Sequence, residues 1–179
     1  DTNLPRQSDK QLAESVRLYQ TGQVDDALTM LAESIMEDPV NIRLPLTLSK
    51  LLVNEGRFAD AEQLLSSMPP EQRREQSITN FQAQIEFIQT ASNAPAIPDL
   101  ESRLQQKPDD CEARQQLACL QLANDDYEHA LEHFMTLMQT DRTFNNDAGR
   151  RGLLVIFSIL GNDHDLVKKY REQLVESLH

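Results

Sequence analysis

Long hydrophobic runs are missing from this sequence of 179 residues. No stretch approaches the roughly 18 consecutive apolar residues of a membrane-spanning helix. Nor does a basic start followed by an apolar run mark a secretory signal. We therefore expect no membrane contact. The chain opens at Asp1 without a methionine, which indicates a fragment or a processed product.

Tryptophan is absent, and only five glycines occur, while Leu, Ala, Gln and Glu are frequent. These residues are good helix formers, so the composition favours an all-helical protein. The length suits one ordinary domain that can bury a continuous core.

Positive charge is scarce, because 17 Lys and Arg stand against 29 Asp and Glu, for a net charge of −12. An acidic body repels phosphate backbones, and no basic stripe with interleaved aromatics offsets that repulsion. The sequence therefore predicts no nucleic-acid partner. An acidic surface also serves simply to keep a protein soluble.

Cysteine is limited to Cys111 and Cys119. Eight residues apart on one helix, they are separated by about 12 Å, which is too far for a disulfide. No C-x-x-C is present, so the chain has no thioredoxin-type redox site of its own. Two unpaired thiols suit a reducing compartment, and we expect a cytoplasmic protein.

One pattern recurs along the chain: a small residue is followed four positions later by a bulky apolar one. The first copy is Ala27 with Leu31, and further copies begin at Ala61, Ala96 and Ala130, at spacings of 34, 35 and 34 residues. The small residue lets a neighbouring helix approach closely, and the bulky one fills the groove between the helices. This period with these anchors resembles the tetratricopeptide repeat (TPR), a helix–turn–helix unit.

We expect an all-α fold in which about five antiparallel helix pairs stack into a right-handed TPR solenoid with one concave face. The predicted helices cover residues 8–21, 25–38, 41–55, 58–67, 74–90, 98–107, a segment from 110, 127–140, 148–160 and 163–178. Gly22 and Gly56 are expected at turns, with Asp125 in the same place in a later pair. Ser8 is expected to cap the first helix together with Gln11. Residues 1–7 are expected to be a linker and residues 8–179 the TPR domain.

Two constellations suggest chemistry but have simpler explanations. His129-x-x-Glu132-His133 matches the inverted zinc-protease motif H-x-x-E-H. Each histidine directly precedes a packing anchor, and few residues follow His133 that could supply a further metal ligand. A metal-dependent hydrolase is therefore only our third hypothesis, after the two protein-binding functions described below. The acidic pairs at 109–110 and 125–126 lie where helix N-caps are wanted. With no phosphate loop and no G-x-S-x-G motif, we expect no catalytic, cofactor-binding or metal-binding residues and no enzyme.

Two surfaces are candidates for protein binding. Lys50 with Asn54 fits the first element of a TPR clamp for carboxylates, but the aligned positions downstream do not complete it. The residues expected on the concave groove are Val16, Tyr19, Lys50, Phe81, Ile85, Gln115 and Cys119, a partly apolar set that suits extended or unfolded segments. The last helix carries a wide apolar stripe, part of which must pack on the preceding helix. Its candidate docking residues are Lys168, Tyr170, Arg171, Leu174 and Leu178.

Several stretches resemble the C-terminal TPR region of the bacterial YbbN family, also called chaperedoxins. They include Asp26-Ala-Leu-Thr-Met-Leu31, Asp60-Ala-Glu-Gln-Leu-Leu65, Ala83-Gln-Ile-Glu86, Ala130-Leu-Glu132, Asp147-Ala-Gly-Arg-Arg151, Leu160-Gly161 and Tyr170-Arg171-x2-Leu174. The resemblance implies a co-chaperone that holds unfolded clients during oxidative stress and contacts the chaperonin GroEL or the DnaK system. It also implies a thioredoxin-like domain upstream of residues 1–7. The alternative is a generic TPR scaffold that assembles a bacterial protein complex, for example in envelope biogenesis.

Overall fold

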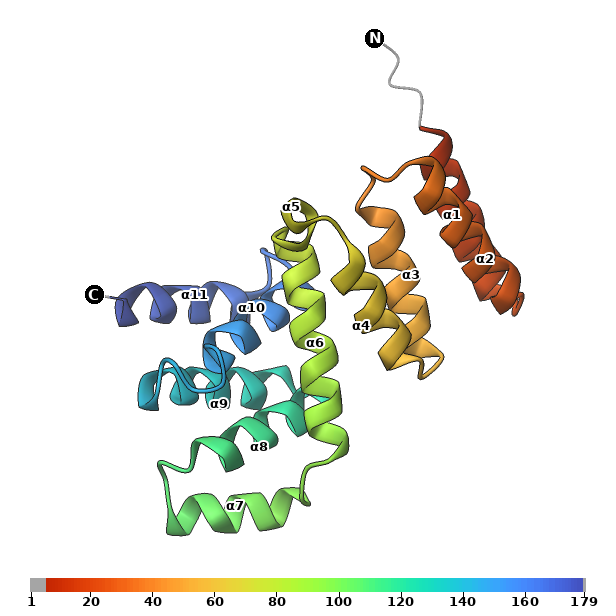
Figure 1. Ribbon diagram of the computed structural model, residues 1–179. Coiled ribbons are helices and arrows are strands. Elements are labelled where there is room, and N and C mark those ends of the chain that lie inside the picture. Colours follow the sequence, from red (N-terminus) through yellow and green to blue (C-terminus); the bar gives the residue numbers. More distant parts are fainter. Residues whose placement is uncertain (1–5, 179) are drawn as a thin grey trace. The chain divides into compact units, whose positions relative to one another are not determined.

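The computed structural model describes residues 6–178, and within that range every regular element is a helix (Figure 1). The helices are α1 (Gln7–Gln20), α2 (Val24–Glu37), α3 (Arg43–Asn54), α4 (Phe58–Ser67), α5 (Pro70–Arg73), α6 (Gln76–Ser92), α7 (Ile97–Gln106), α8 (Cys111–Ala123), α9 (Tyr127–Thr140), α10 (Ala148–Leu160) and α11 (Asp165–Ser177). The all-α prediction is confirmed, and the short helix α5 is an addition to it. Most of the expected linker, residues 1–5, lies outside the described residues, and α1 begins two residues beyond them.

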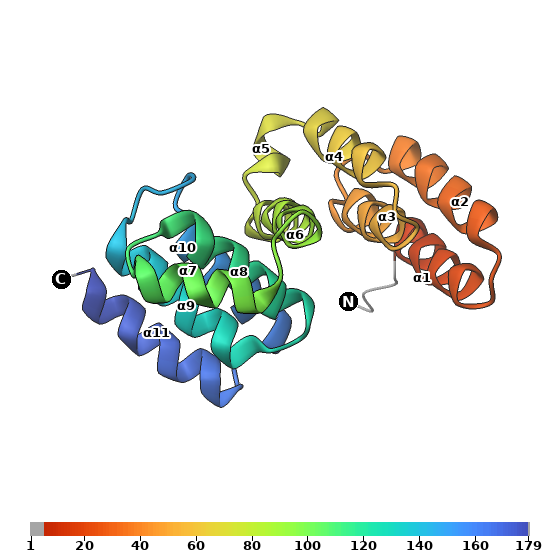
Figure 2. The same ribbon diagram turned by 90° about the horizontal axis from the view of Figure 1, so that it is seen from below.

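The chain divides into two compact units, residues 1–79 and 80–179. In the first unit, α1 packs against α2, α2 against α3, and α3 against α4. In the second unit, α8 lies between α7 and α9, while α10 and α11 both pack against α9 (Figures 1 and 2). Both units are thus built from neighbouring antiparallel helices, as the repeat predicts.

Three helix pairs turn in the same way. Gly22, Gly56 and Asp125 have φ angles of +84°, +74° and +58°. At the first turn, the N–H of Gly22 donates to the carbonyl of Tyr19, and the next N–H donates to that of Leu18. This Schellman arrangement needs a left-handed residue, which glycine adopts at no steric cost and aspartate tolerates better than most. The expected turn positions are therefore confirmed, including the aspartate.

Three of the four predicted alanine anchors are confirmed. Ala27, Ala61 and Ala130 are fully buried, and each is the fourth residue of its helix. The prediction for Ala96 is wrong, because this residue is exposed and stands at the N-cap of α7. Leu100, the fourth residue of α7, is buried in its place. The register shifts because α6 is 17 residues long, against 12 for α3, and the additional residues push α7 along the chain.

Helix starts were predicted with mixed success. Asp110 and Asp126 accept hydrogen bonds from backbone N–H groups three residues on, at 3.0 and 3.4 Å, so both are N-caps as expected. Ser8 does not cap α1, which begins one residue earlier. Its hydroxyl instead donates to the carboxylate of Asp38 at 2.6 Å and accepts from Asn41 at 3.1 Å. Partners at the C-terminal end of α2 and in the loop before α3 thus take the place of the local cap.

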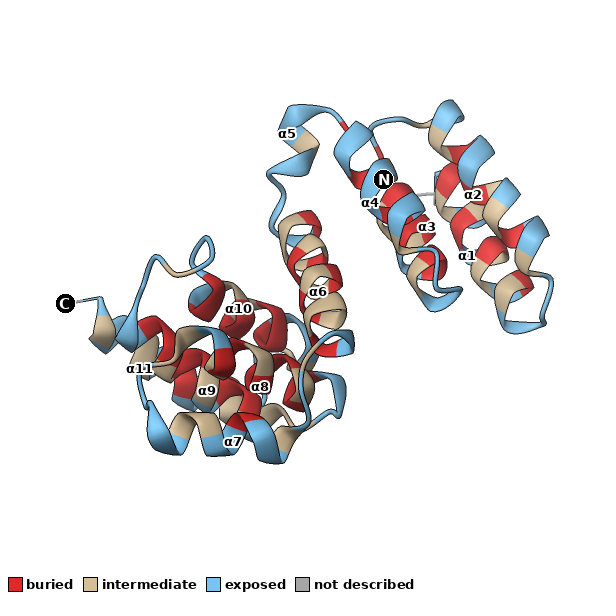
Figure 3. Ribbon diagram, turned by 60° about the horizontal axis from the view of Figure 1, so that its bottom comes forward, coloured by how far each residue is buried: buried red, intermediate tan, exposed pale blue. Residues whose placement is uncertain are grey.

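The core of the second unit depends on a close approach of α10 to α9 (Figure 3). Phe134 is fully buried, and its ring centroid is 5.2 Å from that of Phe87. A Cβ atom at Gly152 would lie 2.3 Å from the Phe134 ring, and one at Gly149 would lie 2.6 Å from the backbone nitrogen of Met138. No other residue type fits at either position without moving α10 away from α9.

Replacing Gly152 with alanine tests this contact. Alanine is favoured over glycine by about 1 kcal/mol in a helix interior. Overpacking a core costs about 1–3 kcal/mol and more where the clashing group cannot move. We therefore expect Gly152→Ala to lower the free energy of unfolding by about 2 kcal/mol, measured by urea denaturation followed by circular dichroism.

The double variant Gly152→Ala/Phe134→Leu provides the control, because a smaller side chain leaves room for the new methyl group. It should be more stable than Gly152→Ala alone. A Gly152→Ala protein as stable as the parent would show that α10 is not held by this contact.

Candidate protein-binding surfaces

Arg151 ties three helices of the second unit together. Its guanidinium donates to both carboxylate oxygens of Glu86, at 2.7 and 3.2 Å, and to the carbonyls of Asn145 and Asn146. The Asn145 amide donates in turn to Gln115 at 3.1 Å and to Glu86 at 3.2 Å. This network joins α6, α8 and α10 through the loop that precedes α10.

That loop has an unusual backbone. Asn145, Asn146 and Asp147 all have positive φ, at +45°, +54° and +59°. Asn and Asp adopt the left-handed region more readily than other side chains, but three in succession require external support. Arg151 supplies it by donating hydrogen bonds to the carbonyls of Asn145 and Asn146.

Four of the residues expected on the groove are buried: Phe81, Ile85, Gln115 and Cys119 are 6%, 1%, 5% and 1% exposed. Gln115 is held within the Arg151 network. Burial, with a smaller effect of Glu86, strongly raises the pKa of the Cys119 thiol. The thiol therefore stays protonated, which suits a packing residue.

The second unit nevertheless has an apolar pocket of about 360 Å³, which we call the inner pocket. It is lined by Gln84, Phe87 and Ile88 of α6, Cys119, Leu122 and Ala123 of α8, Asp125, Tyr127, and Ile159 of α10. Ile159 is 40% exposed, so part of its side chain is accessible at this pocket. Of these residues, the groove prediction included only Cys119. The signal in the sequence that could have predicted this pocket is the set of apolar residues near the C-terminal ends of α6, α8 and α10.

The remaining groove residues belong to the first unit. Val16 and Tyr19 are partly buried on α1, and Lys50 is exposed on α3. The Tyr19 hydroxyl donates to Glu55 at 2.7 Å, and this hydrogen bond raises the pKa of Tyr19. The structure thus distributes the predicted groove over two units, with three residues in one and four in the other.

The stripe on α11 is divided between core and surface. Tyr170 is buried against α9 and α10, and Leu174 is partly buried there. Val175 and Leu178 are 56% and 55% exposed. Lys168 and Arg171 are exposed beside them, and Arg171 donates to Asn162 at 2.6 Å. We call Val175 and Leu178 the α11 apolar face.

The two histidines of the H-x-x-E-H motif have separate partners. His129 Nδ1 lies 2.8 Å from Asp126, whose hydrogen bond raises the pKa of His129. His133 Nδ1 pairs with Arg114 at 3.1 Å, and burial, followed by the charge of Arg114, lowers its pKa. Among residues 6–178, no group of three or more His, Cys, Asp or Glu side chains is placed to hold a metal ion.

Comparison with known proteins gives the class to which this geometry belongs. Two family models, both described as tetratricopeptide repeat, match residues 18–85 and 90–179. The chain belongs to the tetratricopeptide repeat family. Members of this family are scaffolds for protein–protein interaction, and this is the function that the fold assigns to the chain. In the described part, no helix is both long and apolar enough to cross a bilayer.

Three individual proteins are similar to this chain, and their names state no activity. An uncharacterized protein of Haemophilus influenzae is 25% identical over 177 residues, covering 98% of this chain and 81% of its own length. A solved domain of protein VP0806 from Vibrio parahaemolyticus, of unknown function, is 25% identical with a TM-score of 0.40, covering 94% of this chain and 98% of its own. A structure described as MamA RS-1 ArsTM double mutant is 15% identical with a TM-score of 0.45, covering 97% and 96%.

The Arg151 network should contribute measurably to stability. Its side chains are partly exposed, at 26% for Arg151 and 39% for Glu86, so solvent screens the ion pair. Loss of the hydrogen bonds to two loop carbonyls adds to the effect. We expect Arg151→Ala to lower the free energy of unfolding by about 1–2 kcal/mol in urea denaturation.

Arg150 is the matched control, because it is the adjacent arginine on the same helix and is exposed. Arg150→Ala should change stability by less than about 0.5 kcal/mol. Equal losses for the two variants would mean that the effect comes from net charge and not from the network.

Proposed function

We propose that this chain is the TPR part of a cytoplasmic, thioredoxin-like co-chaperone. In this proposal the inner pocket holds apolar side chains of unfolded client segments, and the α11 apolar face contacts GroEL or the DnaK system under oxidative stress. Residues 1–7 would lead from a thioredoxin-like domain. The resemblance to the YbbN family supports the proposal, and the inner pocket is the observation that carries it.

The inner pocket has the properties needed to hold an unfolded segment. Residues of α6, α8, α9 and α10 contribute to it, and apolar residues dominate its lining. Burial of apolar surface contributes about 25 cal/mol of binding free energy per Å² and does not require a particular sequence. Many different client segments could therefore bind. A helical scaffold that is already ordered loses little conformational entropy on binding.

The surface charge supports the same function. A net charge of −12 keeps a complex with an aggregation-prone client in solution, since like-charged particles repel each other. Asp125 lies at the inner pocket, where its carboxylate accepts from the Tyr127 hydroxyl at 2.8 Å. It would favour segments in which a basic residue accompanies the apolar one.

The α11 apolar face supports a contact with a second protein. The terminal repeat of a solenoid usually presents a polar outer surface, because nothing stacks on it. Val175 and Leu178 depart from this rule, with Lys168 and Arg171 exposed nearby. A folded partner would bury these two side chains.

A generic assembly scaffold is the second candidate, and one observation favours it. Met36 and Val40 in the first unit are 84% and 71% exposed. Large apolar residues this exposed mark contact sites for folded proteins when they lie close together. A scaffold would use this site to join a stable partner, independently of the inner pocket.

Client holding is tested by placing a charge in the inner pocket. We expect Ile159→Asp to raise the concentration needed to suppress aggregation of heat-denatured citrate synthase by roughly 5-fold, because a buried apolar contact is replaced by a hydrated carboxylate. Light scattering measures the suppression. Met36→Asp adds the same charge at an exposed residue of the other unit and should leave suppression unchanged. If both variants perform like the parent, the inner pocket does not hold clients.

The chaperonin contact is tested on α11. We expect Val175→Ser/Leu178→Ser to weaken binding to immobilised GroEL by roughly 10-fold, since two exposed apolar side chains lose their buried area in the complex. Met36→Ser/Val40→Ser is the control, because it replaces two apolar residues of the other unit that are even more exposed. Equal binding by the α11 variant and the parent would remove α11 from the proposed contact, and a loss confined to the control would favour the scaffold function.

A further inference from the structure

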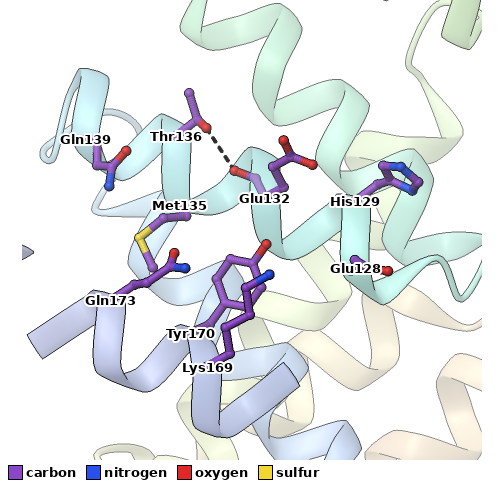
Figure 4. A pocket seen from close by; sticks show the side chains of 9 residues that line it. All are labelled: Glu128, His129, Glu132, Met135, Thr136, Gln139, Lys169, Tyr170 and Gln173. Carbon is purple, nitrogen blue, oxygen red and sulfur yellow. Dashed lines mark hydrogen bonds between the residues drawn. The ribbon is translucent and has the colours of Figure 1, made fainter. Parts of the chain in front are cut away.

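A polar groove lies between α9 and α11 (Figure 4). These two helices contribute only one residue, Tyr127 at the start of α9, to the lining of the inner pocket. The polar groove has a volume of about 580 Å³, and we call it the outer groove. Its lining consists of Glu128, His129, Glu132, Met135, Thr136 and Gln139 from α9, with Lys169, Tyr170 and Gln173 from α11. The spacing of these residues follows one face of each helix, so the groove runs along the two helices.

Two carboxylates of the outer groove form no ion pair with any described residue. Glu128 and Glu132 are one helical turn apart on α9, and within residues 6–178 neither side chain forms an ion pair or a hydrogen bond. The nearby His129 is already held by Asp126 at 2.8 Å. Like charges at this spacing repel each other, so a cation shared between them would be stabilised.

Tyr170 provides independent evidence for a ligand. Only 5% of this residue is exposed, yet its hydroxyl forms no hydrogen bond with any described residue. Figure 4 shows the hydroxyl directed into the outer groove, on the side of Glu132. Because this hydroxyl opens into the groove and no side chain of the described residues occupies it, it is available to accept a hydrogen bond from a ligand. Burial, and then the charges of Glu132 and Glu128, raise the pKa of Tyr170, so the carboxylates' negative potential reaches the phenol.

The other wall of the outer groove explains why the ligand carries a single charge. The Lys169 ammonium lies 5.3 Å from the centroid of the Tyr170 ring, and it repels a second cation. It can donate to a main-chain carbonyl. Gln139 and Gln173, further along, each offer a donor and an acceptor for peptide groups.

We infer that the outer groove binds one arginine side chain from an extended segment of a partner protein. The guanidinium donates to the carboxylates of Glu128 and Glu132, and the Tyr170 hydroxyl oxygen accepts a further N–H. Arginine fits better than lysine because its planar fork has five donors that can serve several acceptors at once. Two carboxylates against one ammonium exclude an acidic segment. This site does not depend on client binding in the inner pocket.

The test uses the whole chain and short fluorescein-labelled peptides with one central arginine among alanine, serine and leucine. In matched peptides the arginine is replaced by citrulline, which keeps the shape without the charge, by lysine or by glutamate. Fluorescence anisotropy measures the affinity. Backbone amide shifts in ¹H–¹⁵N spectra locate the bound peptide.

We expect the arginine peptide to shift amides near Glu128, Glu132 and Tyr170. Glu128→Gln/Glu132→Gln should weaken binding by roughly 10-fold or more, and the citrulline peptide should bind as weakly to the parent protein. Tyr170→Phe retains the packing and should cost roughly 3-fold through the lost hydroxyl.

Glu172→Gln/Glu176→Gln is the matched control, because these exposed glutamates of α11 have the same spacing and lie outside the outer groove. This variant should bind within about 2-fold of the parent. Equal weakening by the two double variants would show general attraction to an acidic protein and would overturn the inference. So would amide shifts confined to the inner pocket, or tighter binding of the glutamate peptide.

Discussion

A stack of four groups organises the second unit. The guanidinium of Arg151 lies 5.5 Å from the centroid of the Phe87 ring, Phe87 lies 5.2 Å from Phe134, and Phe134 rests on the bare backbone of Gly152. Two adjacent residues of α10 therefore hold the two ends of an aromatic pair that comes from α6 and α9. The spacing of α10 from α9 is fixed by the ring, and the distance from α6 is fixed by the ion pair to Glu86. Because α11 packs on both α9 and α10, its position follows from the same stack.

In this arrangement, several residues of the motifs that resemble the YbbN family have a structural role. Glu86, at the end of one motif, is the partner of Arg151, at the end of another. Gly149, in the same motif as Arg151, lets the backbone of α10 approach the backbone of α9 at Met138. These residues hold α6, α9 and α10 together, and this packing role does not depend on what the unit binds. The motifs therefore support the fold more strongly than they support a function, and evidence for function has to come from the pocket, the groove and the exposed apolar side chains.

Local signals in the sequence predicted the helices and turns well. Phe58–Ser67, Tyr127–Thr140 and Ala148–Leu160 begin and end at the predicted residues, since capping aspartates, glycines and the apolar period act within a few positions. The register of α7 was not predictable in this way, because Ala96 fits the period and only the additional length of α6 displaces it. Nor was the burial of Gln115, whose partner Asn145 is thirty positions away and reaches it through a left-handed loop. A repeat frame shows which side of a helix a residue occupies, but it does not show which distant side chain covers that residue.

The two candidate sites differ in their physical chemistry because α9 is used on both sides. Its inward stripe, Ala130 and Phe134, supports the core beneath the inner pocket, and its outward stripe, Glu128 and Glu132, lines the outer groove. Apolar binding at the inner pocket should strengthen in the presence of kosmotropic salts, whereas charge-assisted binding at the outer groove should weaken as salt screens the carboxylates. Occupation of one site leaves the other open, because their linings share no residue. In the two proposals the same helix would serve a nonspecific client and a specific basic partner, and the salt dependence of each assay would show which site it reports.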